Sequence, residues 1–290
     1  MDIVGLVSGG KDSCYNMMCA VDAGHRIVAL ANLHSGDRGE LDSYMYQSVG
    51  TEGVATMAEA MCLPLYRKEI VGTAINKDSN YYATSITSSY NKGSVGDYTT
   101  GFFRGMICIK GKEIHLDIES EFVLPTAGDE VEDLYELLKI VKNHHPSIRG
   151  VSVGAILSNY QKLRVENICE RLNLVPLCYL WEREQKGLLR EMLSRGLDAI
   201  LIKVAAIGLD KSHIGMKLSE MELTLNQLNS QFGVHPCGEG GEYETFVYDC
   251  PLFQKSIDVV DSEIVTHQDD PIAPVHYLRL LKLRLTEKLK

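Results

Sequence analysis

The chain has 290 residues, of which 45% are hydrophobic and 23% are charged, enough for one large domain or two modest ones with a sizeable core. Its 29 basic and 39 acidic side chains leave a formal net charge of −10, which opposes nucleic acid as a partner and favours a basic protein. The eight cysteines contain no C-x-x-C pair and lie mostly in apolar stretches, which indicates buried thiols in a reducing compartment.

The chain begins with an apolar run, residues 3–7, that is followed by Ser8-Gly9-Gly10-Lys11-Asp12-Ser13. This pattern predicts a buried strand, a glycine-rich turn and a helix over residues 13–23 that ends at Gly24. Such a turn aims several backbone N–H groups at one point, and the N-terminus of the helix adds partial positive charge. The expected occupant is a phosphate or pyrophosphate.

The same turn has to be distinguished from a Walker A loop. Gly5 to Lys11 satisfies the first part of that motif, but Asp12 stands where the motif needs Ser or Thr to hold Mg²⁺. Residues 4–7 also have the character of strand interior, which leaves too short a loop to wrap a β-phosphate. We therefore exclude a P-loop NTPase.

Short aliphatic runs alternate with helical patterns, which predicts an α/β protein with a parallel sheet covered by helices. The predicted strands are residues 3–7, 27–33, 65–70, 151–156, 175–180 and 199–204. In a doubly wound sheet of order 3-2-1-4-5, the winding reverses between the first and fourth strands, where ligands bind. The loops after Val7 and Ile156 should therefore face each other across a nucleotide.

Two further helices are predicted from apolar stripes that face the core, one after Asp129 and one over residues 217–232. The first stripe consists of Val131, Leu134, Leu138 and Val141. Residues 129–133 also place four acids in one helical turn. They complement the helix dipole, and binding of Mg²⁺ or ammonium is the alternative interpretation.

One segment does not follow this alternation. Residues 73–100 are rich in Ser, Thr, Asn, Tyr and Gly, and residues 101–125 have the pattern of two strands around Gly111 and Lys112. We expect an insertion over residues 73–127 that is flexible, includes a marginal hairpin and is dispensable to the core.

A second half-site is expected after the fourth strand, in residues 158–166. Ser158 and Gln161 have the spacing of a capping box, and Tyr160 and Arg164 are helical neighbours. A plain helix start and a nucleotide or substrate contact remain equal alternatives for this segment.

The third motif is Gly238-Glu239-Gly240-Gly241-Glu242-Tyr243-Glu244-Thr245. Its glycines allow a tight turn and a close approach to a ligand, and its gathered carboxylates suit a cationic substrate, ammonium or a proton from an attacking amine. Lys203 interrupts a strand that is predicted to be buried. Contact with a phosphate and a position at the solvent-exposed end of the strand are equal interpretations of this lysine.

No membrane span is expected, because the most apolar stretch, residues 199–209, is short and contains Lys203. The chain enters its first strand directly after Met1 and Asp2, which leaves no room for a leader. We expect a cytoplasmic protein.

These three motifs, in this order, resemble the diphthine–ammonia ligase (diphthamide synthetase) family of the PP-loop N-type ATP pyrophosphatases. The resemblance covers residues 1–71 and 128–280, and it is specific because residues 8–13 and 238–245 occur together. The segment 72–127 is not part of the usual pattern, and Asn159 stands where that pattern has Asp.

The resemblance implies a Rossmann-like, HUP-type nucleotide-binding domain over residues 1–180 and a smaller α+β substrate domain over residues 181–290. It also implies a C–N bond-forming ligase that uses ATP and Mg²⁺ to amidate the diphthine carboxylate on elongation factor 2. Free ammonium would supply the nitrogen, and an acyl-adenylate would form with release of pyrophosphate and AMP.

Roles for single residues follow from the same resemblance. The implied nucleotide-binding residues are Ser8, Gly9, Gly10, Lys11, Asp12, Ser13 and His34, with Mg²⁺ on Asp12. The implied substrate-binding residues are Tyr160, Gln161, Arg164, Glu239, Gly240, Gly241, Glu242, Tyr243 and Glu244. Lys11, Asp12 and Glu242 are the implied catalytic residues, and Tyr243 would contact the trimethylammonium group of the substrate through its ring.

Two other functions compete with this one. A PP-loop enzyme that modifies tRNA is disfavoured by the charge of −10 and by the lack of paired cysteines. A non-catalytic module that binds adenine nucleotides is disfavoured because it has little use for Lys11 and Asp12 at the phosphate end.

Overall fold

The computed structural model describes residues 1–36, 49–75, 104–109, 112–117 and 128–288. It divides the chain into one compact unit of residues 1–81 and 128–290 and a second of residues 82–127. Each unit is described by itself.

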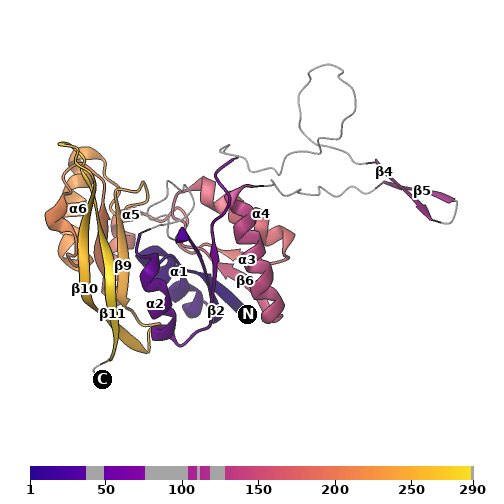
Figure 1. The fold of residues 1–290 in the computed structure, drawn as a ribbon, viewed down its shortest axis with the longest axis horizontal. Helices are drawn as coiled ribbons and strands as arrows, with labels where there is room; N and C mark the ends of the chain where they lie inside the picture. Colours follow the sequence, from indigo (N-terminus) through magenta and orange to yellow (C-terminus); the bar gives the residue numbers. More distant parts are fainter. Residues whose placement is uncertain (37–48, 76–103, 110–111, 118–127, 289–290) are drawn as a thin grey trace, which may run out of the picture. The chain divides into compact units, whose positions relative to one another are not determined.

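A five-stranded parallel sheet forms the first layer of the larger unit (Figure 1). Its strands, in spatial order, are β3 (Leu65–Glu69), β2 (Arg26–His34), β1 (Asp2–Leu6), β6 (Ile148–Ser152) and β7 (Val175–Leu177). The predicted order 3-2-1-4-5 is therefore confirmed, and the winding reverses between β1 and β6.

Helices cover both faces of this sheet, as a doubly wound fold requires. On one face, α3 (Glu130–His144) and α4 (Asn159–Arg171) bury a cluster that includes Ala31 of β2. On the other face, α1 (Lys11–Asp22) and α2 (Val54–Met61) pack over its neighbour Leu30. The stripe predicted for α3 is buried along its whole length, as expected.

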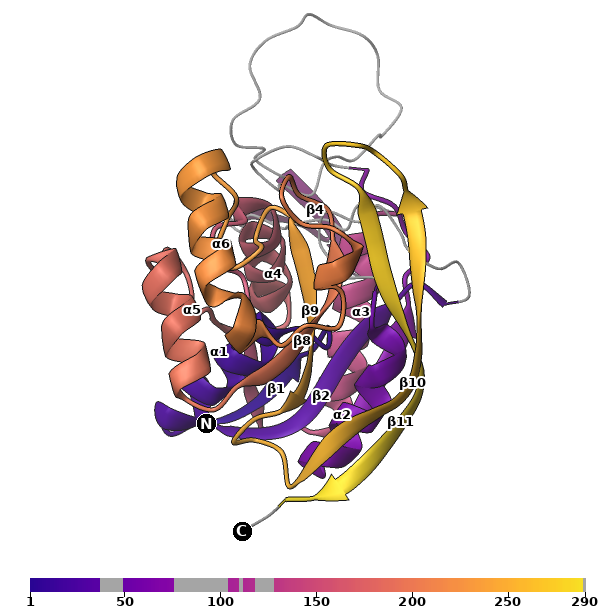
Figure 2. The same ribbon diagram turned by 90° about the vertical axis from the view of Figure 1, so that its left-hand side faces the viewer.

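A second, antiparallel sheet lies beyond α1 and α2 (Figure 2). Its order is β10 (Lys255–Gln268), β11 (Val275–Glu287), β8 (Asp198–Val204) and β9 (Tyr243–Asp249). The helices α5 (Gln185–Ser194) and α6 (Leu218–Phe232) precede and follow β8, and α6 ends at Gly233 with φ 76°. The predicted α+β character of the C-terminal region is confirmed.

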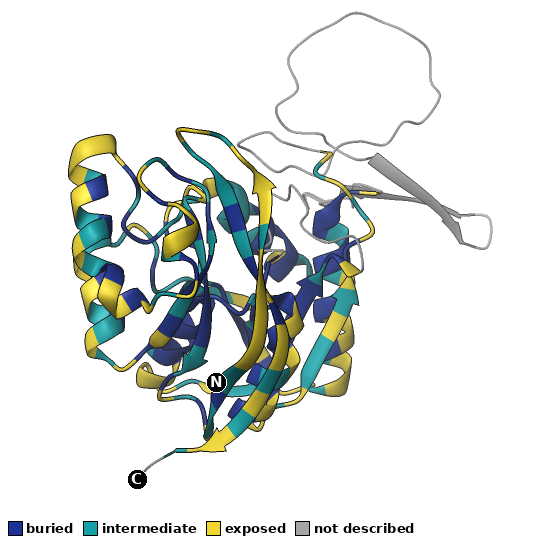
Figure 3. Cartoon of the chain, turned by 60° about the vertical axis from the view of Figure 1, so that its left-hand side comes forward, coloured by how far each residue is buried: buried dark blue, intermediate teal, exposed yellow. Residues whose placement is uncertain are grey.

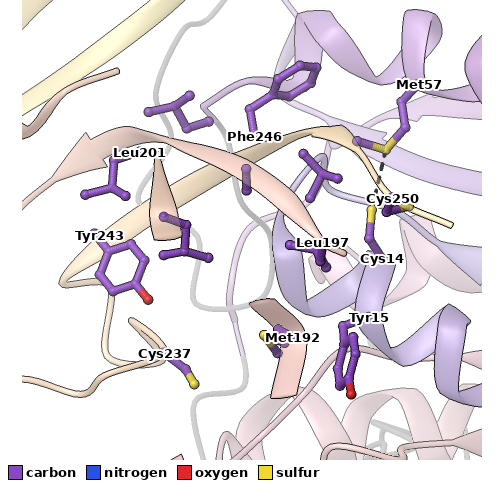
Figure 4. Packing of buried hydrophobic residues seen from close by; sticks show 14 of the residues in the cluster. Cys14, Tyr15, Met57, Met192, Leu197, Leu201, Cys237, Tyr243, Phe246 and Cys250 are labelled. Atoms are coloured by element: carbon purple, nitrogen blue, oxygen red, sulfur yellow. Dashed lines mark hydrogen bonds between the residues drawn. The ribbon is translucent and has the colours of Figure 1, made fainter. Parts of the chain in front are cut away.

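One hydrophobic core joins the two sheets (Figure 4). Cys14 of α1 and Met57 of α2 pack in the same cluster as Leu201 of β8 and Phe246 of β9. In Figure 3, stretches of both sheets and of the helices between them are coloured as buried. This core includes residues on both sides of residue 180, and the domain boundary there stays a prediction.

Three predicted elements have a bound that differs from the structure by two residues or more. The strand expected over 151–156 ends at Ser152, because the N–H groups of 156–158 turn toward a carboxylate. The strand expected over 175–180 ends at Leu177, since the N–H of Tyr179 donates to the Asn16 side chain. The first helix begins at Lys11 rather than at residue 13.

The predicted two strands of the insertion are present in the smaller unit. β4 (Arg104–Ile109) and β5 (Lys112–Asp117) form an antiparallel pair. The flexibility expected of residues 73–100 falls almost entirely outside the described residues. At the base of the insertion, in the larger unit, the Thr73 N–H donates to the Gly128 carbonyl at 3.0 Å.

The described residues also form two short 3-10 helices, η2 (Thr51–Gly53) and η3 (Lys211–His213). Within the described part of the chain, none of the helices has both the length and the apolar surface that crossing a bilayer demands.

Candidate active site

A cavity of about 510 Å³ opens at the reversal of the parallel sheet. Most of its lining comes from three segments: residues 6–13 at the end of β1 and after it, residues 153–158 after β6, and residues 238–245 before and within β9. Residues 31–33 of β2 add to it. The loops after the first and fourth strands thus meet as predicted, and the third motif meets them there.

Eleven of the residues predicted for the site line this cavity: Ser8, Gly10, Lys11, Asp12, Ser13, Gln161, Glu239, Gly240, Gly241, Tyr243 and Glu244. Five others are not among its lining residues: Gly9, His34, Tyr160, Arg164 and Glu242. The roles assigned to all of them stay predictions, but their contacts differ in ways that matter for the chemistry.

The glycine-rich turn is held by hydrogen bonds to β9. Gly9 has φ +98°, a conformation that other residues rarely adopt, and its carbonyl accepts the N–H of Val247 at 2.9 Å. The first N–H of α1, on Lys11, donates to the Thr245 hydroxyl at 3.1 Å. Asp12 and Ser13 follow in the same helical turn and line the cavity, so the N-terminal end of α1 faces it.

The loop after β6 packs directly against this first turn of α1. A Cβ atom added to Gly154 would stand 2.7 Å from both the Asp12 carbonyl carbon and the Ser13 nitrogen. Only glycine permits this approach, and it is what brings the second loop to the edge of the cavity.

Lys11 is held by the C-terminal segment rather than extended into open space. Its side chain is 4% exposed. The Nζ atom donates to Asp12 Oδ2 at 2.9 Å and to the Cys237 carbonyl. The same atom lies 5.1 Å from the centre of the Tyr243 ring. Burial opposes the charge, but the Asp12 carboxylate and the other partners raise the pKa of Lys11 above its usual value. A protonated lysine is therefore fixed at the mouth of the turn.

Asp12 uses one oxygen on Lys11 and leaves the other without a partner. Its Oδ1 is buried and accepts no hydrogen bond in the described part of the chain. Burial raises the pKa of Asp12, Lys11 opposes that shift and Glu239 adds to it. An orphaned carboxylate oxygen beside a phosphate-type turn is suited to a cation that also binds phosphate.

Glu239 bridges the C-terminal turn to the loop after β6. Its Oε1 accepts three backbone N–H groups, those of Ile156 at 3.1 Å, Leu157 at 2.8 Å and Ser158 at 3.0 Å. Ser158 is the N-cap of α4, as predicted, and accepts the Gln161 N–H. Glu239 therefore supplies the negative charge at the N-terminus of α4 and ties the loop to the turn.

Glu242 faces the inside of its own turn. Its Oε1 accepts the His235 N–H at 2.9 Å, and its Oε2 is buried without a partner in the described residues. Tyr243 is buried as well, with its hydroxyl donating to the Pro236 carbonyl at 2.6 Å. The aromatic contact predicted for a substrate cation is, in this structure, made with Lys11.

The two cations left open by the sequence have partners within the protein: a carboxylate for Lys203 and a tyrosine for Arg164. Lys203 and Glu244 are opposite each other on β8 and β9, with Nζ and Oε1 3.2 Å apart. Arg164 is fully buried; its guanidinium lies 3.2 Å from the centre of the Tyr160 ring, and the Tyr160 hydroxyl donates to Glu130. Tyr160 and Arg164 thus pack between α3 and α4, while Gln161 reaches the cavity.

The sequence reasoning missed three residues at the site. Asn32 of β2 lines the cavity and donates to the Val7 carbonyl, while Thr245 caps Lys11. His235 organises the C-terminal turn through its ring. Asn32 could have been found as a polar residue in a buried strand, but nothing near His235 marked it.

The thiol of the adjoining Cys237 is buried. Burial raises the pKa of the Cys237 thiol to about 12, so it stays protonated near neutrality. This agrees with the expectation of buried, unreactive thiols.

A parallel sheet of this order, with a glycine-rich turn and a helix N-terminus at its reversal, defines a Rossmann-like α/β protein, a class in which ligands bind at this reversal. The comparisons with known proteins are more specific. Family models described as the diphthamide synthase N-terminal and C-terminal domains match residues 1–93 and 184–280. The chain therefore belongs to the diphthamide synthase family.

Curated relatives extend this match over nearly the whole chain. A diphthine–ammonia ligase from Danio rerio is 51% identical over 99% of this chain and 98% of its own length. One from Homo sapiens is 49% identical over 100% of this chain and 94% of its own. One from Schizosaccharomyces pombe is 45% identical over 94% of this chain, which spans 38% of that longer protein. These relatives are ligases that form a C–N bond, the class expected from the resemblance.

Proposed function

We propose that this protein amidates the carboxylate of diphthine on elongation factor 2, with ATP as co-substrate and free ammonium as the nitrogen source. The observation that carries the proposal is that one cavity is lined by both a phosphate-type turn and a carboxylate-rich turn. The names of the curated relatives support the same reaction. The reaction with elongation factor 2 places the enzyme in the cytoplasm.

In this proposal the first half of the cavity binds the phosphates of ATP. Phosphate oxygens accept hydrogen bonds from the N–H groups of Ser8, Gly9, Gly10 and Ser13, and the fixed ammonium of Lys11 offsets their charge. His34, near the carboxyl end of β2, is close to the adenine. Residues 1–180 supply this nucleotide half, and residues 181–290 supply most of the substrate half.

Mg²⁺ fits the orphaned Oδ1 of Asp12, because this ion is usually held by one or two carboxylates together with substrate phosphates. No group of three or more His, Cys, Asp or Glu side chains in the described residues could hold a metal alone. When bound, the ion would neutralise charge on the leaving pyrophosphate.

The reaction then proceeds in two displacements. A carboxylate oxygen of diphthine attacks the α-phosphorus of ATP, and the bond to the β-phosphate oxygen breaks with loss of pyrophosphate. Ammonia then attacks the acyl carbon of the adenylate, AMP leaves with the bridging oxygen, and the nitrogen loses a proton to give the amide. The chain contributes mainly positioning and charge neutralisation.

The acidic half of the cavity suits the cationic groups of this substrate. The carboxylates of Glu239 and Glu244 are there; Glu244 is paired with Lys203 and Lys11 with Asp12, which leaves the Glu239 carboxylate as the excess negative charge. A trimethylammonium group and an ammonium ion are both attracted to such a surface. In the proposal, the walls of this half are supported by three residues that do not line the cavity: Glu242, Tyr160 and Arg164.

The test compares Asp12→Asn with Asp22→Asn, at opposite ends of α1. Pyrophosphate release is measured with elongation factor 2 that carries diphthine, the same factor without diphthine, and total tRNA. We expect pyrophosphate release only with the diphthine form of the factor. The release rate should fall by at least about a hundredfold in Asp12→Asn. It should stay normal in Asp22→Asn, because that side chain pairs with Arg195 at the surface. Release stimulated by tRNA alone would contradict the proposal.

A further inference from the structure

The C-terminal turn that closes the cavity is built around the imidazole of His235. His235 Nδ1 lies 3.0 Å from the Cys237 nitrogen and 3.5 Å from the Glu239 nitrogen. Both partners are backbone N–H donors, so Nδ1 must accept. The ring is therefore neutral, with its proton on Nε2.

The two residues that His235 holds are those that contact the rest of the site. The Cys237 carbonyl accepts from Lys11 Nζ, and the Glu239 carboxylate accepts the three N–H groups of residues 156–158. One imidazole nitrogen thus fixes the backbone that orients the lysine beside the phosphate-type turn and the carboxylate that holds the loop after β6.

We propose that His235 is a positioning residue that acts through Nδ1, by setting the turn that places Lys11 and Glu239 around the cavity. It does not touch the reacting atoms, and its effect on catalysis rests on the proposed function. The structural part of the proposal, an accepting Nδ1 in a neutral ring, holds independently of the reaction.

Protonation of the ring would put a hydrogen on Nδ1, against two N–H donors. The charged groups around the ring are Glu242, Glu239 and Lys11. Burial, together with Lys11, lowers the pKa of His235 below its ordinary value, while Glu242 and Glu239 oppose the shift. The turn is therefore intact at neutral pH and is lost only as the pH falls from the ordinary histidine value toward the lowered one.

Three substitutions separate the two ring nitrogens. In His235→Asn the amide oxygen takes the place of Nδ1, and Asn readily accepts the N–H two residues further on. In His235→Gln the amide replaces Nε2 instead, and His235→Ala replaces neither. His213→Asn in η3, a half-buried capping histidine that is not among the residues lining the cavity, is the matched control.

We expect His235→Asn to keep kcat/KM for ATP within about threefold of the original protein, while His235→Gln and His235→Ala lose roughly tenfold to a hundredfold. His235→Asn should also lose the decline in activity at acid pH. Equal losses in Asn and Ala variants of matched melting temperature would overturn the proposal, and activity kept in His235→Gln would then assign the role to Nε2. Full activity in His235→Ala would also overturn it.

An activity-independent measurement keeps this test separate from that of the reaction. Two-bond proton–nitrogen correlation spectra of the complete protein at neutral pH should show a His235 ring with its proton on Nε2, identified by its absence in His235→Asn. A proton on Nδ1 would contradict the proposal, whatever the outcome of the ligase assay. A protein with no ligase activity but an accepting Nδ1 would refute only the proposed function.

Discussion

Gly154 is the residue at which the two loops of the cavity come closest. A methyl group there would meet the backbone of Asp12 and Ser13 at 2.7 Å, which cannot be relieved by rotating a side chain. Gly154→Ala should therefore displace the first turn of α1 and weaken binding of a non-hydrolysable ATP analogue by about tenfold or more, measured by calorimetry.

Gly196→Ala is the matched control for this substitution. A Cβ at Gly196 would meet nothing within 4 Å, but its φ of +74° makes alanine strained by about 1–2 kcal/mol. It should lower stability and leave nucleotide affinity unchanged. If both variants bound the analogue equally well, the close approach at Gly154 would have no role in the site.

At the scale of single residues, the sequence identifies residues that would contact a ligand more readily than residues that position those contacts. Residues 8–13 and 238–245 could be recognised because glycines and charges gather in a short span. His235 could not, because its role depends on hydrogen bonds to Cys237 and Glu239 that form only in the folded turn. A single histidine between apolar residues carries no such pattern.

Among the elements, β9 connects the C-terminal sheet to the nucleotide loop. Phe246 of this strand is fully buried, and a Cβ on Gly53 would stand 2.4 Å from its ring. Phe246→Ala should lower the free energy of unfolding by about 3–5 kcal/mol, measured by urea titration with circular dichroism.

Phe232→Ala provides the comparison, because Phe232 ends α6 with 52% of its surface exposed. The unfolding free energy of the Phe232→Ala variant should differ from that of the original protein by no more than about 0.5 kcal/mol. Equal shifts in the two variants would mean that β9 is not part of the common core.

Elements with an apolar pattern were predictable, whereas those stabilised by partners were not. The strands of the parallel sheet are short aliphatic runs, and their order follows from general winding rules. The long β10 and β11 pair escaped prediction, because acids and polar residues interrupt its apolar pattern and the outer part of β10 is exposed (Figure 3). Pairing between the two strands, rather than burial, holds that region.

At the scale of the whole molecule, the main consequence of the fold is that the N-terminal and C-terminal parts of the chain form the site together. The glycine-rich turn comes from the first residues of the chain, and the residues that fix it, Thr245 and Cys237, come from the last third. Glu52 adds a further link, since its carboxylate accepts the Leu280 N–H of β11 at 2.9 Å. The cavity therefore depends on both sheets being in place, which no single motif could have indicated.

The identity of the nucleotide product tests the central proposal most directly. The complete protein is incubated with ATP labelled at the α-phosphate, ammonium and elongation factor 2 that carries diphthine, and the labelled products are separated. We predict labelled AMP in a one-to-one ratio with the amide formed, because the carboxylate attacks the innermost phosphorus. Labelled ADP as the product would contradict this, since it would mean that attack occurs at the terminal phosphate instead.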